Sequence, residues 1–456
     1  MEQVNLDDCK RIAFVASGGA TKALFYHIGV SIALKEYGIE IASVPKDERD
    51  PSRHYVDHVV GSSGGAIFGA LAVSGFDEGM IETKLESKSL LSYFYNTTKR
   101  KKGDLVGFSY QDVFCPNLPS PGELIKLAKR YASLHRLRQK YGPSIGLEAL
   151  VRELLPHAAF FNLSRLEKYL EDVLTINDFE ELHEKKEVDF HVIATEVDYP
   201  RKAVFGRHRS PWIGTDEDDF YRDRYLDNCS IARAVRASCS LPGIFAPTEI
   251  DGAYYYDGEV KKVLSTHVAK DHGADLILVS HTFTPYIRNG NMGSIAEMGI
   301  FSLVVQAIYT ILYQKIQTPR EIHAQIKNLY RYIDSDEFKK KFKKLSKKEH
   351  SELLKDIAEK LNFNPDLKYI FFPSPNETFF MDHFNMLPFA TRELINSGYT
   401  VANEVLPLHG LKKLPEYEER GILQRSGLKR FRFDRTQYEQ YRKVMRANFP
   451  NLIMQD

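Results

Sequence analysis

The chain has 456 residues, of which 43% are hydrophobic and 27% are charged, and its formal net charge is +1. This composition is typical of a globular protein with a large core, and the near-zero charge predicts no nucleic acid or other polyanion as a partner. The four cysteines lack CxxC spacing, so a zinc site or a disulfide scaffold is not expected. They are Cys9, Cys115, Cys229 and Cys239.

The N-terminus carries acids where a secretory signal peptide has bases, and its apolar run covers only Ile12 to Ala16. No stretch reaches the roughly 18 consecutive apolar residues typical of a membrane-spanning helix. The nearest approach, from Ile300 to Leu312, is short and contains Ser302, Gln306 and Thr310. We therefore expect a cytoplasmic protein without signal peptide or transmembrane helix, able to touch a membrane peripherally.

In chain order, short runs of β-branched and other apolar residues alternate with segments whose apolar residues have helical spacing. Strands are predicted at Arg11–Ala16, Val56–Val60, Phe190–Glu196 and Ala274–Thr282, and a helix from about Thr21 to Tyr37. The alternation predicts an α/β fold with a central, mostly parallel sheet and helices on both faces.

Two segments interrupt this rhythm. Residues from about 97 to 160 open with a basic cluster and then show helical periods, which predicts a helical insertion over the sheet. Residues from about 335 to 368 form a second, lysine-rich insertion. We expect both to belong to one domain over residues 1–405, followed by a basic C-terminal extension over 406–456.

The strongest local motif is Gly61-x-Ser63-x-Gly65, which lies between an apolar strand and a small-residue helix. A serine on such a tight turn exposes its hydroxyl at the edge of the sheet, and the glycines are needed because a Cβ would clash with neighbouring elements. The helix N-terminus behind the serine favours developing negative charge. The alternative interpretation is a purely structural turn, because glycine-rich loops also produce this pattern by chance.

A nucleophilic serine needs a base, and two arrangements are open. An α/β-hydrolase triad requires several strands before the nucleophile and a histidine late in the chain, but only one clear strand precedes the strand of Ser63. None of the later histidines has a context typical of a catalytic residue; they are His267, His272, His281, His323, His350, His383 and His409. The second arrangement is a Ser–Asp dyad.

The segment from Ala232 reads ARAVRASCSLPGIFAPTEIDGAYYYDGEV. It resembles the patatin-like phospholipases, in which a small-residue helix, Ser-x-x-x-Pro and an aromatic strand ending in Asp-Gly follow one another. Here the matching positions are Ser238, Pro242, Phe245, Pro247, Tyr256, Asp257 and Gly258. The family's nucleophile motif matches Gly61 to Gly65, and its glycine-rich loop with a basic residue matches Ser17 to Lys22. The resemblance covers about residues 10 to 90 and 160 to 405.

The resemblance implies a three-layer patatin-like fold and hydrolysis of phospholipids or other lipid esters, as phospholipase A or lysophospholipase, through an acyl-enzyme. Ser63 would be the nucleophile and Asp257 its base. Backbone N–H groups of Gly18, Gly19 and Ala20, beside Lys22, would form the oxyanion hole. Neither a cofactor nor a metal is expected. The sequence does not predict the oligomeric state.

The glycine-rich loop departs from the family pattern, because Ala20 stands at the third glycine and Lys22 replaces an arginine. Ala20 would be strained if its position requires a positive φ. Two alternatives therefore stay open: a soluble esterase or thioesterase that uses the same dyad, and a catalytically silent binding protein that keeps the fold.

Within the lysine-rich insertion, Phe338, Phe342 and Leu345 fall at i, i+4 and i+7 between lysines. This pattern predicts either a membrane-surface helix or a solvated helix whose apolar stripe packs on its own domain.

Overall fold

The structure is a computed structural model of the whole chain. Besides a few isolated positions between 122 and 139, it describes residues 3–74, 113–116, 159–199, 201–208, 223–261, 263–288, 294–297, 299–343, 345–375, 383–384, 386 and 388–425.

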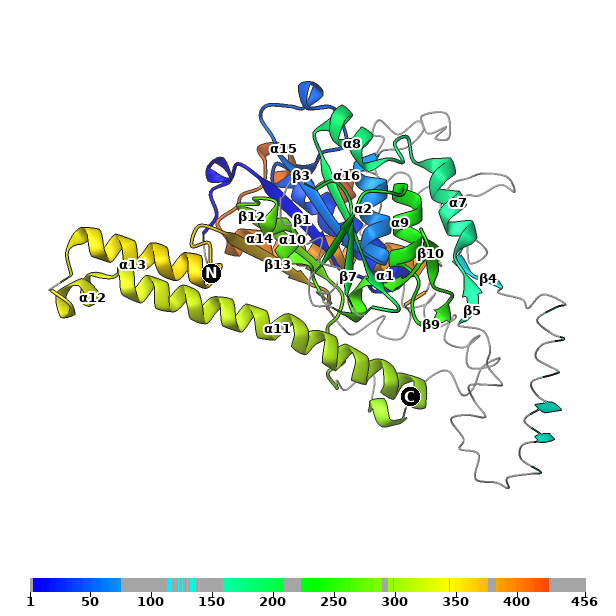
Figure 1. The fold of residues 1–456 in the computed structure, drawn as a ribbon. Helices are drawn as coiled ribbons and strands as arrows, with labels where there is room; N and C mark the ends of the chain where they lie inside the picture. The colour runs from blue at the N-terminus through cyan, green and yellow to red at the C-terminus, as the bar shows by residue number, and fades with distance from the viewer. Residues whose placement is uncertain are drawn as a thin grey trace.

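A large sheet runs through the centre of the molecule (Figure 1). Strands β6, β3, β1, β12 and β13 lie side by side and parallel, and β11 and β10 continue the sheet antiparallel at one edge. The bounds in spatial order are β10 (Thr248–Ile250), β11 (Ala253–Asp257), β6 (Asp189–Glu196), β3 (His54–Ser62), β1 (Ile12–Ala16), β12 (Leu276–His281) and β13 (Lys368–Pro373). Since all five residues of β1 and all six of β12 are buried, these strands form the centre of the core, as expected for a parallel sheet covered on both faces.

Shorter strands extend this sheet and form a second one. β2 (Ile39–Ile41) pairs with the start of β3, and β7 (Lys202–Phe205) joins β6 to β8 (Arg224–Leu226). The second sheet has three strands, β4 (Cys115–Pro116), β5 (Ala159–Asn162) and β9 (Gly243–Phe245).

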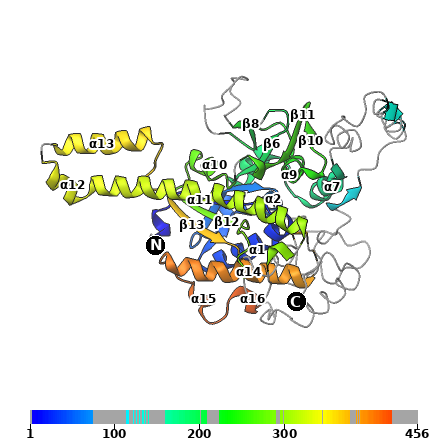
Figure 2. The same cartoon turned by 90° about the horizontal axis from the view of Figure 1, so that it is seen from below.

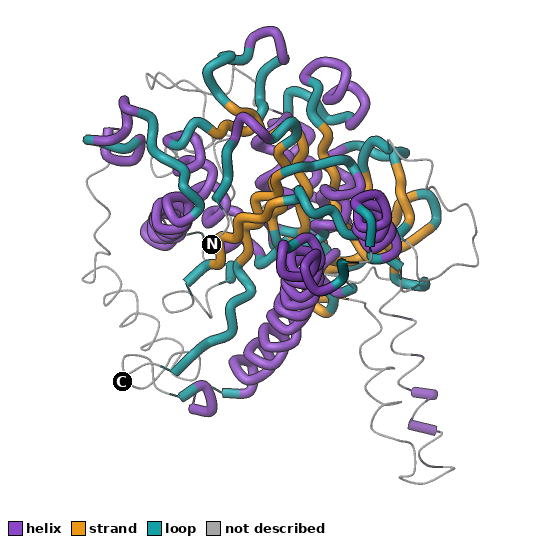
Figure 3. The backbone as a smooth tube through the Cα atoms, turned by 90° about the vertical axis from the view of Figure 1, so that its left-hand side faces the viewer, coloured by secondary structure: helices purple, strands orange, loops and turns teal. Residues whose placement is uncertain are grey.

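Helices cover both faces of the large sheet, which gives the predicted three-layer α/β arrangement (Figures 2 and 3). On one face lie α1 (Ala20–Glu36), α2 (Gly64–Ser74), α7 (Ser164–Val173), α8 (Phe179–Lys186), α9 (Ile231–Ser238) and α14 (Pro388–Leu408). On the other lie α10 (Thr266–Asp271) and the long helix α11 (Ile300–Asp334). Short 3₁₀ turns occur at Leu6–Asp8, Lys46–Glu48, Gly258–Val260 and Ile295–Glu297.

The four strands and the helix predicted from hydrophobic patterns are confirmed as β1, β3, β6, β12 and α1. The pattern analysis did not predict β13, because its residues follow directly on the lysine-rich segment. Helix α14 runs to Leu408, past the expected domain boundary at residue 405. Two short helices follow, α15 (Pro415–Glu418) and α16 (Ile422–Arg425).

The lysine-rich segment forms α12 (Asp336–Lys341) and α13 (Lys347–Lys360), which fold back beside the end of α11 (Figure 1). Ser346 and Glu349 form a capping box that starts α13. Because α12 ends at Lys341, the expected stripe of Phe338, Phe342 and Leu345 does not lie on one helix, and the prediction of a continuous membrane-surface helix there is wrong. Phe338 instead packs against the rings of Tyr332 and Phe342.

Most of the expected helical insertion at about 97–160, and residues 426–456 of the basic extension, lie outside the described residues. Among the helices that are described, none is both long and apolar enough to cross a membrane.

Helices α1 and α14 cross at two glycines, which allows their backbones to touch. A Cβ on Gly29 would lie 1.9 Å from the carbonyl oxygen of Ile395, and a Cβ on Gly398 would lie 2.1 Å from that of Tyr26. Because backbone lies at the contact, neither neighbour can rotate away.

Gly398→Ala should therefore lower the free energy of unfolding by at least about 1–3 kcal/mol, the usual cost of overpacking. The neighbouring change Ser397→Ala, on the same helix, should stay within about 0.5 kcal/mol of the wild type. Urea denaturation measures both. Equal midpoints for the two variants would contradict the close helix crossing.

Candidate active site

Ser63 lies on a sharp turn between β3 and α2. Its φ of 50° is in the left-handed region, which is unusual for a residue other than glycine and indicates local strain. The flanking glycines permit this turn: a Cβ on Gly61 would lie 2.5 Å from the carbonyl oxygen of Gly65, and one on Gly65 would lie 2.3 Å from that of Ala16. The predicted strand–turn–helix setting is confirmed.

Ser238, the last residue of α9, holds this turn in place. Its hydroxyl accepts a hydrogen bond from the Ser63 N–H at 2.8 Å and donates one to the carbonyl of Ile193 at 2.5 Å. The serine of the Ser-x-x-x-Pro motif is thus a positioning residue for Ser63, a role that sequence spacing alone did not assign.

Asp257 ends β11, and the Ser63 side chain lies close enough to lower the pKa of its carboxyl group as a hydrogen-bonding neighbour. The carboxylate also accepts the Glu259 N–H at 3.0 Å, which starts the 3₁₀ turn at Gly258–Val260. Asp257 is only 4% exposed, and this burial raises its pKa to about 6. Gly258 is required beside it, because a Cβ would lie 2.3 Å from the Ile193 carbonyl oxygen.

The glycine-rich loop after β1 lies directly against Ser63: a Cβ on Gly18 would be 3.0 Å from the Cβ of Ser63. Thr282 fixes the loop by donating from its hydroxyl to the Gly18 carbonyl at 2.9 Å. Ala20 has a φ of 54°, so the alanine at the family's third glycine carries the strain expected for it. Among the described residues, no hydrogen bond engages the N–H of Gly19 or Ala20 at the start of α1.

Glu259 was not singled out from the sequence, although it contacts this loop. Its Oε1 accepts the Gly18 N–H at 2.7 Å, so one of the three expected oxyanion donors is engaged by a carboxyl group. Burial is the main cause of a pKa raised to about 8, and the nearby Asp257 raises it further. Glu259 directly follows the Asp257-Gly258 motif, and this is the sequence feature from which its place in the site could have been predicted.

Comparison with known proteins shows the family of this chain. The family model described as "Patatin-like phospholipase" matches residues 14–270, more than half of the chain. The chain belongs to the patatin-like phospholipase family. At the family level it is therefore a lipid acyl hydrolase with lipid substrates. Among solved structures, VipD from Legionella pneumophila is 15% identical with a TM-score of 0.36, and the match covers 88% of this chain and 67% of that one.

Lys22 occupies the place of the basic residue in the patatin-like loop, but its side chain lies in the interior. It is 2% exposed, and its Nζ lies 5.8 Å from the centroid of the Tyr309 ring on α11. Burial lowers its pKa to about 8. Within the described residues, its ammonium group lies over the Tyr309 ring and its backbone N–H donates to the His383 carbonyl, and neither group contacts Ser63 or Asp257.

His27 is the histidine closest in sequence to the glycine-rich loop, and its contacts are structural. Its ring nitrogens lie 2.7 Å from the Ser280 hydroxyl and 2.9 Å from the Ser17 carbonyl oxygen. Burial lowers its pKa to about 4, so the ring is neutral and holds the loop through Ser17.

Cys239 also borders the site, which its isolated place in the sequence did not suggest. Its thiol is buried, and burial raises its pKa well above the usual value, with Asp257 and Ser63 as its polar neighbours. The thiol beside the site is therefore neutral.

The strain at Ala20 leads to a stability prediction. Ala20→Gly should raise the free energy of unfolding by up to about 1 kcal/mol, because the left-handed backbone costs alanine about 1–2 kcal/mol while glycine adds entropy to the unfolded chain. Ala23→Gly, one turn further along α1, should instead lower it by about 1 kcal/mol. Chemical denaturation distinguishes them, and destabilisation by both changes would refute the strain.

Proposed function

We propose that this chain cleaves carboxylic ester bonds of phospholipids, as a phospholipase A or lysophospholipase, through a Ser63–Asp257 dyad. The observation that carries the proposal is the placement of Ser63 on a strained turn beside a glycine-rich loop, with the buried Asp257 carboxyl group as the neighbour of its side chain. A buried carboxylate with a raised pKa is suited to accept and return a proton near neutral pH.

In the first step, Ser63 Oγ attacks the ester carbonyl carbon while its proton passes to Asp257. The carbonyl oxygen gains the negative charge, and backbone N–H groups of Gly19 and Ala20 at the positive end of α1 would bind it. The C–O bond then breaks, and the leaving alcohol takes the proton from Asp257. In the second step, Asp257 accepts a proton from water, the hydroxide attacks the acyl-enzyme, and Ser63 regains its proton as the fatty acid leaves.

A dyad is favoured over a triad because the histidine beside the loop is unable to act as base. Both ring nitrogens of His27 are engaged by Ser17 and Ser280. Asp257, in contrast, is a near neighbour of the Ser63 side chain, which lowers the pKa of its carboxyl group.

One face of α11 favours a lipid surface over a soluble ester as the source of substrate. Five large apolar side chains on its first three turns are between 46% and 81% exposed; they are Ile300, Leu303, Val304, Ile308 and Ile311. The helix is tied to the site, since Lys315 donates to the carbonyl of Val260, one residue beyond Glu259. Peripheral insertion of this apolar face would bring Ser63 close to a membrane.

The catalytically silent alternative has one observation in its favour, the engagement of the Gly18 N–H by Glu259. An ionised Glu259 would also repel the oxyanion that forms nearby. Its raised pKa leaves the group mostly neutral below pH 8, which is compatible with turnover in that range.

Ser63→Ala and Asp257→Asn should each lower kcat on a micellar phospholipid by factors on the order of 10⁴ or more, because the nucleophile or its base is lost. The test is fatty acid release by variants whose circular dichroism matches the wild type. His27→Gln and His383→Gln serve as comparisons and should retain far more activity. A histidine variant as inactive as Asp257→Asn would favour a triad.

The two carboxyl groups predict a bell-shaped pH profile. Below pH of about 6, Asp257 is protonated and unable to accept the serine proton, so kcat/KM should rise as pH increases through about 6. Above about 8, ionised Glu259 should oppose the oxyanion, so the rate should fall. Glu259→Gln should remove only the alkaline fall; an unchanged alkaline limb in that variant would assign it to another group.

Replacing Ile300, Leu303, Val304, Ile308 and Ile311 by Gln should strongly weaken sedimentation with neutral phosphatidylcholine vesicles, because each apolar side chain buried in lipid contributes about 1.5–3 kcal/mol. Hydrolysis of a soluble short-chain ester should be unchanged. The comparison variant replaces Lys339, Lys340, Lys341, Lys343 and Lys344 by Gln and should lose affinity only for anionic vesicles. Undiminished vesicle binding by the apolar-face variant would exclude this face of α11 as the lipid contact.

A further inference from the structure

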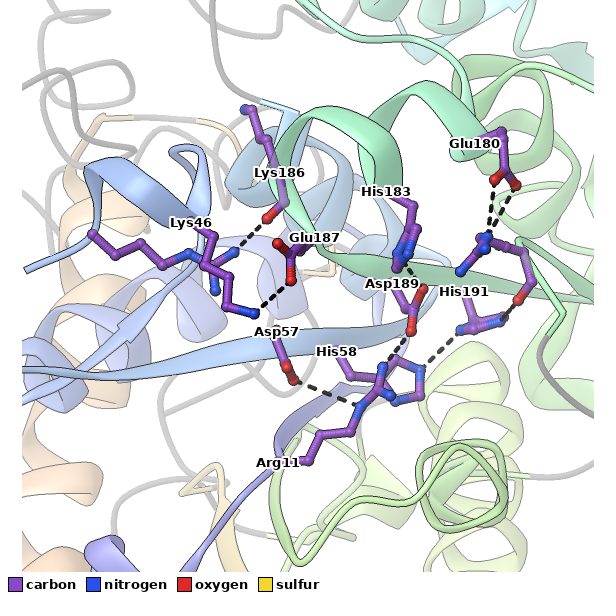
Figure 4. Close-up of polar contacts among 12 residues, drawn as sticks. Arg11, Lys46, Asp57, His58, Glu180, His183, Lys186, Glu187, Asp189 and His191 are labelled. Atoms are coloured by element: carbon purple, nitrogen blue, oxygen red, sulfur yellow. Dashed lines mark hydrogen bonds and ion pairs between the residues drawn. The ribbon is translucent and has the colours of Figure 1, made fainter. Parts of the chain in front are cut away.

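Three histidines that are distant in the sequence meet inside the protein, on the sheet face that α10 covers. His58 comes from β3, His191 from β6, and His272 directly follows α10; they are 0%, 0% and 6% exposed. One ring nitrogen from each lies within 4.8 Å of the others. The ring centroids are 5.0, 5.2 and 4.3 Å apart. Figure 4 shows His58 and His191 pointing toward each other from neighbouring strands.

Hydrogen bonds on the outer side of the cluster fix the tautomers of two rings. His191 Nε2 lies 2.8 Å from the Arg207 carbonyl oxygen, and His272 Nδ1 lies 2.8 Å from that of Val268. Since a carbonyl only accepts, these two nitrogens carry the hydrogens. The lone pairs of His191 Nδ1 and His272 Nε2 therefore face inward, in the arrangement by which proteins orient metal-binding histidines.

The cluster therefore has two inward-facing acceptors, on His191 and His272, but one N–H group, on His58, to donate to them. His58 Nε2 lies 2.9 Å from His191 Nδ1 and can donate to it. His272 Nε2 is buried and has no hydrogen-bond partner among the described residues. A buried acceptor without a donor is costly, and a cation between the three rings would satisfy it. Burial keeps the rings neutral, since it lowers the pKa of His191 to about 3 and also lowers that of His272.

We propose that His58, His191 and His272 bind a zinc ion. Neutral imidazole nitrogens are ligands that zinc prefers, and tetrahedral Zn–N bonds of about 2.0–2.1 Å place ligand nitrogens about 3.3 Å apart. The His58–His191 nitrogens at 2.9 Å need to separate by only a few tenths of an ångström. On binding, His58 carries its hydrogen on Nδ1 instead of Nε2, so no net proton is released.

The surrounding charges favour a cation at this position. The buried carboxylate of Asp189 interacts electrostatically with His191 and His272 and forms an ion pair with Arg11, and its Oδ1 lies 2.9 Å from His183 Nδ1 (Figure 4). The Asp57 carboxylate is 3.7 Å from Arg11 Nε and also interacts electrostatically with Arg49. Water, or His208 from the loop after β7, would take the fourth position of the ion. Both ring nitrogens of His208 are buried and, within the described part of the chain, have no hydrogen-bond partner.

The zinc would be structural and separate from ester hydrolysis. His58 precedes Ser63 by five residues along β3, or about 16 Å at about 3.3 Å per residue. An ion there would connect β3, β6 and the end of α10. It would therefore raise thermal stability without taking part in the reaction.

The test uses the untagged full chain, stripped with a chelator and titrated with Zn²⁺ by calorimetry, with metal content measured after gel filtration. We expect one zinc per chain and a higher Tm with zinc. His191→Gln and His272→Gln should each weaken zinc affinity at least about 100-fold. Loss of a residue that only hydrogen-bonds to a ligand already weakens metal affinity by up to about 100-fold, and each of these changes removes a ligand itself. His267→Gln, on the same helix but bonded to Asp223, should bind zinc like the wild type.

Substitution of Co²⁺ into the wild type gives a readout that does not depend on any variant folding. Coordination by three imidazoles in a tetrahedral site predicts intense visible absorption bands. A stripped wild-type chain that binds no zinc at micromolar free Zn²⁺, a weak octahedral Co²⁺ spectrum, or wild-type affinity in a folded His272→Gln variant would each overturn the proposal.

Discussion

The close approach of two strand-to-helix turns is the constraint on which the candidate active site depends. The turn after β3 packs against the turn after β1 so closely that a Cβ on Gly64 would lie 2.1 Å from the Ala20 carbonyl oxygen. This contact brings the glycine-rich loop against Ser63 and directs the N-termini of α1 and α2 to the same place. The approach requires a left-handed backbone at Ala20 and Ser63, which costs on the order of 1–3 kcal/mol at each residue. Packing of the buried strands on both sides keeps the two turns in this strained conformation.

Burial then gives the carboxyl groups of the site their properties. Asp257 and Glu259 are separated by one glycine, and both have raised pKa values because the interior disfavours their charge. In the proposed reaction Asp257 would act as the base near neutral pH, while Glu259 contacts the loop that would bind the oxyanion. The same two residues therefore connect the rate of the proposed reaction with pH.

Local patterns in the sequence predicted the features that depend on neighbours in the chain. The turn around Ser63, the Asp-Gly at the end of an aromatic strand and the strain at Ala20 all follow from short motifs. The contact of Glu259 with Gly18 and the cluster of His58, His191 and His272 depend on strand order and register, which bring together residues more than 80 positions apart. The expectation of no zinc site came from cysteine spacing, which carries no information about histidines on separate strands.

The most direct measurement of the central claim is covalent labelling with a fluorophosphonate, followed by mass spectrometric mapping of the modified residue. Such a probe reacts with a serine only when a base and an oxyanion site activate it. We predict modification of Ser63 alone in the wild type, and much slower labelling in Asp257→Asn. Modification of a different residue, or no labelling of a folded wild-type chain, would contradict the Ser63–Asp257 dyad.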